Sequence, residues 1–158
     1  MLPAFTSAHS HALQIGLRGS GEHFPGGTAD FWTWRQAMYG LVERMDPDLA
    51  YQLAHRCYRE MVQAGIRTVG EFHYLRHHVF DESDFVLDEV VIQAAHDAGI
   101  ELVLLPAAYE EGGPGVDLSP AQRRFETGGV HRYWERFDQL QGMLRAGQSM
   151  QACVHSLR

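Results

Sequence analysis

The stretch Pro3-Ala-Phe-Thr-Ser-Ala-His-Ser-His11 is an apolar run that ends in two histidines one residue apart. Residues i and i+2 of a β-strand project from the same face about 6.5 to 7 Å apart, so His9 and His11 can direct their imidazoles at one point. Catalytic zinc usually binds three protein ligands and keeps one position for water. Paired histidines also occur as ordinary surface or packed residues. The position of this pair, at the end of an apolar strand and before a glycine-rich loop, favours two of the ligands of a metal site.

The composition indicates a single folded domain. The chain has 158 residues, of which 45% are hydrophobic and 21% charged, which is enough for a single core. A formal net charge of -7 argues against binding to nucleic acid or to an anionic membrane, which both require clustered positive charge. Cys57 and Cys153 lack the density of a disulfide framework, so we expect both to be reduced core residues. Without a long apolar run or a signal peptide, the expected location is cytoplasmic.

Hydrophobic periodicity alternates along the chain between the periods of strands and helices. Asp46-Pro47-Asp48 is a typical helix start, and Gly65 and Gly99 are typical helix ends. Residues 16–27 form a glycine-rich connection. The pattern predicts strands at 3–11, 67–72, 101–107 and 150–155, and helices at 29–44, 46–65, 84–98 and 131–146.

This alternation is typical of a parallel α/β sheet, which can be a doubly wound open sheet or a (β/α)8 barrel. The glycine fingerprint of a dinucleotide-binding fold is absent after the first strand. Histidines follow the strands at their C-terminal ends, where barrel enzymes carry their chemistry. Because only four strands are present, the sequence predicts a partial (β/α)8 TIM-type barrel of about the first four βα units.

Several other residues have more than one interpretation. Glu71 could be a general base, but its place inside a strand favours a partner for a ligating histidine. His73 could orient Tyr74 or be a structural residue. The polar loop after Tyr74 predicts that His77 and His78 are solvated.

Five segments together resemble the formimidoylglutamate deiminase branch of the amidohydrolase superfamily. They span nearly the whole chain, and H-x-H alone would indicate only the superfamily. The segments are Ala8-His-Ser-His-Ala-Leu-Gln14, Asp30-Phe-Trp-Thr-Trp-Arg35, Gly70-Glu-Phe-His-Tyr-Leu75, Ser119-Pro-Ala-Gln-Arg-Arg-Phe125 and His155-Ser-Leu-Arg158.

The resemblance implies hydrolysis of N-formimidoyl-L-glutamate to N-formyl-L-glutamate and ammonia by a cytoplasmic, homodimeric enzyme with one zinc ion. His9 and His11 would be two of its metal ligands. The remaining ligands and the general acid and base would lie on later strands, so no catalytic residue is assigned here. Residues 1–158 would then be one partial barrel domain, lacking the second half of the barrel and the small β-rich domain, and inactive alone.

The substrate of this family is a small molecule with two carboxylates, and arginine matches a carboxylate with a planar fork of donors. By resemblance, Arg35, Tyr74 and Arg158 bind the carboxylates, and Gln14 and His155 make further polar contacts. Two alternatives stay open: another deaminase of the superfamily that acts on a ring substrate, and a noncatalytic remnant that binds a ligand or a partner chain. Paired arginines favour a formimidoylglutamate deiminase over a ring deaminase, because a neutral ring has no charge for them to neutralise.

Overall fold

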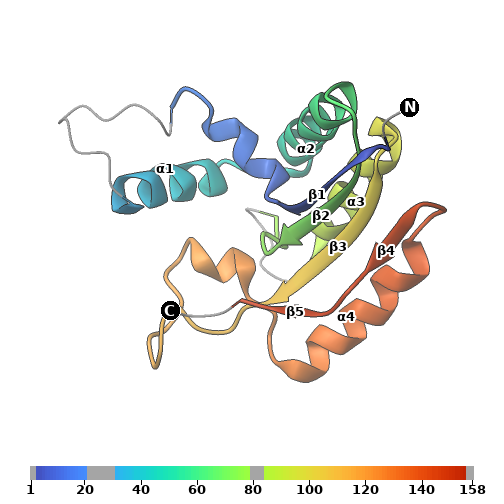
Figure 1. Ribbon diagram of the computed structural model, residues 1–158. Helices are drawn as coiled ribbons and strands as arrows, with labels where there is room; N and C mark the ends of the chain where they lie inside the picture. Colours follow the sequence, from blue (N-terminus) through green and yellow to red (C-terminus); the bar gives the residue numbers. More distant parts are fainter. Residues whose placement is uncertain (1–2, 21–30, 79–83, 156–158) are drawn as a thin grey trace.

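Five parallel strands form one sheet in the computed structural model, which describes residues 3–20, 31–78 and 84–155 (Figure 1). The strand order is β1-β2-β3-β4, and β5 pairs with β3 beyond the end of β4. The parallel α/β architecture predicted from the sequence is confirmed. The strands are β1 (Phe5–Ser10), β2 (Ile66–His73), β3 (Glu101–Ala108), β4 (Gln148–Met150) and β5 (Cys153–Val154).

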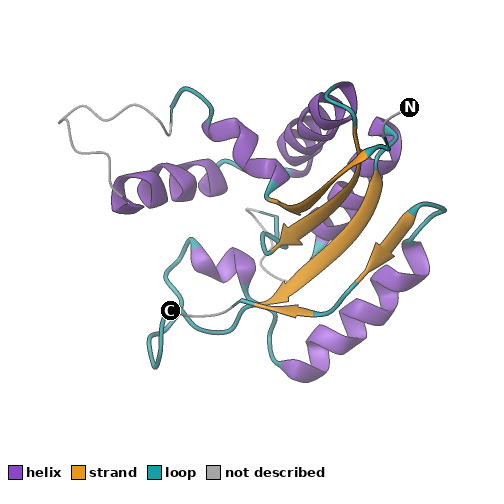
Figure 2. Cartoon of the chain, in the orientation of Figure 1, coloured by secondary structure: helices purple, strands orange, loops and turns teal. Residues whose placement is uncertain are grey.

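Helices connect the strands in the expected alternation (Figure 2). Two short 3₁₀ helices, η1 after β1 and η2 in the connection after β3, were not predicted. The helical segments are η1 (Ala12–Leu17), α1 (Phe31–Glu43), α2 (Pro47–Gln63), α3 (Val86–Ala98), η2 (Gln122–Phe125) and α4 (Val130–Met143). None of the helices in the described ranges is long and apolar enough to cross a membrane.

Local signals explain where α2 and α3 begin and end. The side chain of Asp46 accepts a hydrogen bond of 2.7 Å from the backbone N–H of Leu49, and Pro47 occupies the first helical position. Gly99 ends α3 with φ +74°, and its N–H bonds back to the carbonyls of the last helical turn. The cap and glycine patterns in the sequence therefore predicted these boundaries to within about two residues.

The two faces of the sheet have different surroundings. Leu102 and Leu104 of β3 are fully buried on the face covered by α2, α3 and α4, whereas Val103 and Leu105 are only half-buried on the other face. Such a parallel sheet, with its helices on one side, is the wall of a partial (β/α)8-type barrel. Figure 1 shows α1 and η2 (residues 122–125, in orange) beyond the C-terminal ends of the strands.

A bridging side chain divides the fourth strand, which was predicted as one segment at 150–155. Leu104 accepts a backbone hydrogen bond from Gln151, and Pro106, two residues on, has no N–H to continue this ladder. The hydroxyl of Tyr133 lies there instead: it donates to the carbonyl of Pro106 at 2.9 Å and accepts from the N–H of Cys153 at 3.1 Å. The strand is therefore interrupted, and β4 and β5 are separate.

Cys57 and Cys153 are both free thiols, and both side chains are partly buried.

Candidate functional site

His9 and His11 converge as the H-x-H spacing predicts. The Nε2 atoms of the two rings lie 3.1 Å apart, with the ring planes nearly perpendicular. Two nitrogens bound to one tetrahedral zinc at about 2.0 to 2.1 Å would lie roughly 3.3 Å apart. The separation therefore fits two ligands of a single metal ion.

The tautomer of His11 also suits a ligand. Its Nδ1 lies 3.0 Å from the carbonyl oxygen of Phe72, and because a carbonyl only accepts, Nδ1 carries the proton. The Nε2 lone pair of the neutral ring is then directed toward His9. Burial lowers the pKa of His11, which favours this neutral form. A backbone carbonyl on the second ring nitrogen is the usual support of a metal-bound histidine.

A cavity of about 660 Å³ adjoins the histidine pair on the inner side of the wall. Six residues predicted from the sequence line this cavity: His9, His11, Gln14, Arg35, Tyr74 and His155. They come from four separate parts of the chain, and the fold brings them together at one end of the sheet. Arg158, the remaining predicted residue, lies outside the described residues.

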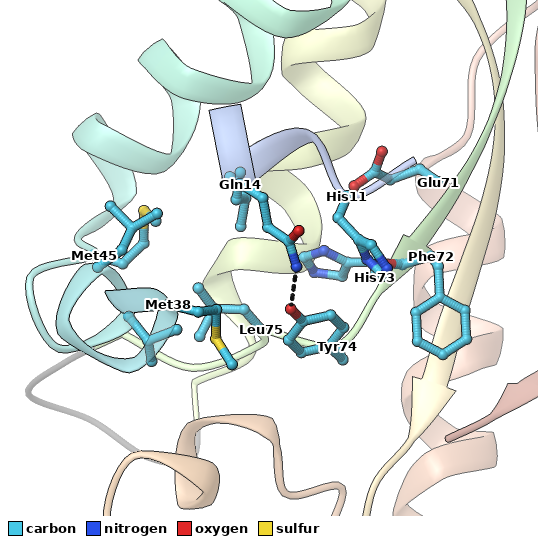
Figure 3. Close-up of a pocket in the computed structure, with 12 residues that line it drawn as sticks. His11, Gln14, Met38, Met45, Glu71, Phe72, His73, Tyr74 and Leu75 are labelled. Carbon is cyan, nitrogen blue, oxygen red and sulfur yellow. Dashed lines mark hydrogen bonds between the residues drawn. The ribbon is translucent and has the colours of Figure 1, made fainter. Parts of the chain in front are cut away.

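Gln14 and Tyr74 contact each other at one side of this cavity. The Gln14 amide donates a hydrogen bond of 2.9 Å to the Tyr74 hydroxyl, and Figure 3 shows His11 and Phe72 beside them. Burial raises the pKa of Tyr74 to about 12, so its hydroxyl stays protonated at neutral pH. A smaller recess of about 30 Å³ lies behind the pair, with Met38 and Met45 in its lining, and has room for about one water molecule. Of these two spaces, the larger cavity has the volume to hold a substrate.

Arg35 lies on α1 among aromatic rings. Its guanidinium carbon is 5.7 Å from the ring centre of Trp32 and 5.4 Å from that of Tyr39. Its Nε donates a hydrogen bond of 2.9 Å to the Tyr39 hydroxyl. Stacking and this hydrogen bond hold the guanidinium in place, while the side chain still lines the cavity.

His155 faces the same space from the segment after β5. Burial lowers the pKa of His155, and the positive charge of Arg35, which lines the same cavity, lowers it further. The ring of His155 lies 4.6 Å from that of Tyr109 and 6.4 Å from that of Tyr74. A neutral imidazole at this position can donate or accept a hydrogen bond.

Glu71 supports the backbone turn after the histidine pair. The sequence favours a different role, as a partner of a ligating histidine. Its Oε1 accepts a hydrogen bond of 2.8 Å from the backbone N–H of Ala12, and no hydrogen bond joins it to His9 or His11 in the described residues. The carboxylate is almost fully buried, and burial raises the pKa of Glu71. Its contact is therefore with the backbone at the start of η1, next to His11, rather than with a ligating ring.

Two other histidines have structural surroundings. His73 is not among the residues that line the large cavity, and its Nε2 lies 3.0 Å from Asp88 on α3, although not in hydrogen-bond alignment. The prediction that His77 is solvated is wrong: the side chain is 1% exposed, and its Nε2 lies 2.7 Å from the carbonyl oxygen of Glu126. The chain that returns after η2 covers this loop, which its polar sequence does not show.

Tyr39, Tyr109 and Phe125 also line the cavity, and the sequence analysis did not identify them. Tyr39 is four residues after Arg35 on α1, a spacing that places two helical side chains together, so it could have been found. Tyr109 directly follows β3 as Tyr74 follows β2, but Tyr74 was identified by the family resemblance, which assigned no role to Tyr109. Phe125 reaches the cavity through η2, for which the sequence has no comparable signal.

The described residues bring two histidines together but do not form a complete metal centre. Within residues 3–20, 31–78 and 84–155, no three His, Cys, Asp or Glu side chains come together as a group that could hold a metal ion. Further ligands would have to come from outside these ranges.

Comparisons with known proteins concern the family and the fold of the chain. The model of the family described as "Amidohydrolase family" matches residues 1–146. The chain is 39% identical over 164 aligned residues to a formimidoylglutamate deiminase of Pseudomonas aeruginosa. That alignment covers 100% of this chain and 36% of the relative, so the chain spans little more than a third of the relative's length.

Two solved structures are similar in fold. The crystal structure of an amidohydrolase from Brucella melitensis superposes with a TM-score of 0.84 at 35% sequence identity, covering 98% of this chain and 36% of that chain. An amidohydrolase from an environmental sample of the Sargasso Sea superposes with a TM-score of 0.61 at 18% identity, covering 94% of this chain and 31% of the other. The second similarity concerns the fold alone.

Proposed function

The chain belongs to the amidohydrolase family, and from this premise we propose that it forms part of a zinc-dependent enzyme that hydrolyses N-formimidoyl-L-glutamate to N-formyl-L-glutamate and ammonia. The observation that carries the proposal is the presence of Arg35 in the same cavity as the converging His9 and His11. An ion-binding pair and a carboxylate-binding cation are the two features that this substrate requires. The relative from Pseudomonas aeruginosa is named as a formimidoylglutamate deiminase, the enzyme of this reaction.

His9 and His11 would hold the zinc ion through their Nε2 atoms. When bound, zinc supplies a water molecule whose pKa is lowered to about 7 and which can attack an amidine carbon. The carbonyl of Phe72 keeps the proton of His11 on Nδ1, and Glu71 holds the backbone turn that follows. These contacts orient the pair without taking part in the chemistry themselves.

The substrate would lie in the large cavity with its carboxylates toward Arg35, Tyr74 and Arg158. Arginine offers a planar set of N–H donors, and a charge-assisted hydrogen bond is roughly twice as strong as a neutral one. Gln14 fixes the Tyr74 hydroxyl, and His155, whose ring lies 6.4 Å from that of Tyr74, adds a polar group to the same cavity. A protein with a formal net charge of -7 thus places local positive charge where an anionic substrate would bind.

The test measures ammonia release from N-formimidoyl-L-glutamate by the complete protein, with a neutral ring amidine as the comparison substrate. His9→Ala and His11→Ala should each lower the bound zinc and abolish turnover. Arg35→Ala should raise KM about tenfold or more while the zinc content is unchanged, because it removes a charge-assisted hydrogen bond. Arg44→Ala is the matched control, since Arg44 lies exposed just after α1 and its Nε bonds to the carbonyl of Gly40.

Preference for the ring amidine would favour a deaminase of a different substrate class. Unchanged zinc content in both histidine variants, by elemental analysis, would exclude the metal assignment. A protein that binds carboxylates but releases no ammonia from either substrate would support the noncatalytic alternative.

A further inference from the structure

Three tyrosines from different parts of the chain line the cavity together with Arg35. Tyr39 belongs to α1, Tyr74 follows β2, and Tyr109 follows β3. Only Tyr74 is among the substrate-binding residues proposed above. The directions of their hydrogen bonds indicate that the three hydroxyl groups have a common role.

The bond at Tyr109 has a direction that its neighbours determine. The Oε1 atom of Gln122 lies 3.0 Å from the backbone N–H of Ser119, which can only donate, so Oε1 is the acceptor there. The Nε2 atom of the same amide therefore faces the Tyr109 hydroxyl, at 2.9 Å. Because an amide nitrogen only donates, the Tyr109 oxygen accepts, and its own proton is directed elsewhere.

The other two hydroxyls accept in the same way. Tyr74 accepts from the Nε2 of Gln14 at 2.9 Å (Figure 3), and Tyr39 accepts from the Nε of Arg35 at 2.9 Å. A guanidinium can only donate, so the direction at Tyr39 is certain. Each phenol oxygen has one proton to give, and within the described part of the chain none of the three hydroxyls donates a hydrogen bond to a protein acceptor.

The bond to Tyr39 also determines how Arg35 meets a ligand. Its Nε is engaged, so the two terminal Nη groups form the end that remains for a carboxylate. Burial raises the pKa of Tyr74 and of Tyr109, so both remain protonated donors at neutral pH. The cavity thus combines one cation with three O–H donors.

We propose that Tyr39 and Tyr109 are further substrate-binding residues, which with Tyr74 donate O–H hydrogen bonds to the carboxylate oxygens of a ligand held by Arg35. The inference rests on the proposed function for the identity of the ligand, an acyclic dicarboxylate. Gln122 is a positioning residue, because its amide keeps the Tyr109 proton available to the ligand.

Ring packing alone does not account for a hydroxyl at Tyr109. Its ring lies 5.3 Å from that of Phe125 and 4.6 Å from that of His155. A phenylalanine would make the same ring contacts. The substitution Tyr109→Phe therefore removes the donor and leaves the packing of the site in place.

The experiment measures binding of N-formyl-L-glutamate to the complete, zinc-loaded protein by calorimetry. Tyr39→Phe and Tyr109→Phe should each weaken the affinity about tenfold, since a hydrogen bond to a charged group is lost. Tyr51→Phe is the matched control, because the Tyr51 hydroxyl donates to Asp97 on the exposed surface, and its affinity should equal that of the parent.

Gln122→Glu tests the role of the Gln122 amide. The new carboxylate can still accept the Ser119 N–H, but it would also accept the Tyr109 proton and turn that hydroxyl away from the ligand. It should therefore weaken binding at least as much as Tyr109→Phe does, and because position 122 is buried, the new charge should also lower the melting temperature. A second ligand, N-formyl-L-glutamine, has one carboxylate replaced by an amide. Its affinity should fall less in these variants than the affinity for N-formyl-L-glutamate does.

Affinities of both phenylalanine variants within twofold of the Tyr51→Phe control would overturn the proposal. If the parent releases ammonia from N-formimidoyl-L-glutamate and the phenylalanine variants bind normally, only this inference fails. If the parent releases none, yet the variants lose affinity for N-formyl-L-glutamate, the inference stands and the proposed function fails.

Discussion

Two neighbours hold the imidazole of His77 in one neutral tautomer. Its Nε2 lies 2.7 Å from the carbonyl oxygen of Glu126 and must donate to it, while its Nδ1 accepts from the backbone N–H of Phe85 at 3.3 Å. A second proton on Nδ1 would remove the acceptor for Phe85. Burial lowers the pKa of His77 from its ordinary value of 6.5, as this geometry requires.

This pKa shift makes stability depend on pH. Between the lowered pKa and 6.5, the unfolded chain binds more protons at His77 than the folded chain does, so the free energy of unfolding decreases as the pH falls from 7.5 to 5.5. His11 and His155, with pKa values also lowered by burial, contribute in the same direction. Urea unfolding at the two pH values should show this decrease, and His77→Gln should make it smaller.

His131→Gln provides the control for that measurement, because the His131 side chain is 92% exposed on α4. It should leave the pH dependence of the unfolding free energy unchanged. Equal stability of the parent at both pH values would contradict the prediction.

Residues whose partners are near in sequence were predictable, and those with distant partners were not. The convergence of His9 and His11 follows from a spacing of two along a strand. The burial of His77 depends on Phe85 and Glu126. The direction of the Tyr109 O–H depends on the amide of Gln122. No periodic pattern connects these positions.

At the scale of elements, Gly70 allows β1 and β2 to approach closely beside the site. A Cβ atom at this position would lie 2.7 Å from the carbonyl oxygen of Ala8, closer than real contacts allow. The pairing of β1 with β2 also shifts register between Ser7 and Ser10, the part of β1 that holds His9. The position of the histidine pair thus depends on a residue with no side chain on the adjacent strand.

Gly70→Ala should displace β1 and weaken zinc binding by about tenfold, the lower part of the range for residues that support metal ligands. Zinc affinity would be measured by competition with a chelator on the complete protein. Gly40→Ala is the control, because a Cβ there meets nothing within 4 Å, and alanine should stabilise α1 by about 0.5 to 1 kcal/mol. Equal zinc affinities in the two variants would show that the close approach is not needed.

A buried charge cluster joins α3 and α4 to the end of β2. Asp88 of α3 is fully buried, and its Oδ2 lies 3.7 Å from Arg76 and 3.3 Å from Arg136, while Oδ1 lies near His73. Burial alone would raise the pKa of Asp88, but the positive charges of Arg76 and Arg136 and the contact with His73 hold it below its usual value. The carboxylate is therefore ionised and compensates two buried guanidinium groups.

Asp88→Ala should lower the free energy of unfolding by about 3 to 5 kcal/mol, because it removes the buried carboxylate from Arg76 and Arg136 and leaves Arg136 only its pair with Glu89. Chemical denaturation of the complete protein would measure the loss. Asp97→Ala, at an exposed position of the same helix, should cause a much smaller change. A similar loss in the two variants would mean that the cluster has no special role in stability.

The elements themselves were largely predictable, because caps, glycines and periodicity are local signals. Asp46 and Gly99 mark boundaries that the structure confirms. The division of β4 from β5 could not be predicted, since it combines the missing N–H of Pro106 with a hydroxyl that Tyr133 contributes from another element. The 3₁₀ helix η1 likewise depends on the contact between Ala12 and Glu71, which is distant in sequence.

At the scale of the whole molecule, the wall leaves apolar surface exposed. Phe5 in β1 is 60% exposed, and Val154 in β5 is 71% exposed. Val103 and Leu105 are half-buried on the inner face of β3. Within the described residues, β1 pairs only with β2, so its outer edge keeps unpaired N–H and C=O groups. Such an edge can pair with another chain.

A polypeptide of these 158 residues, expressed alone, should therefore self-associate and release no ammonia from N-formimidoyl-L-glutamate. Two histidine ligands hold zinc more weakly than the three or more of a catalytic site, and the exposed edges favour pairing between copies. Sedimentation velocity at several concentrations should show species larger than a monomer. Phe5→Lys and Val154→Lys should reduce the association, because charges at a sheet edge oppose pairing. A compact monomer that also releases ammonia would contradict both expectations and would mean that these residues alone complete an active site.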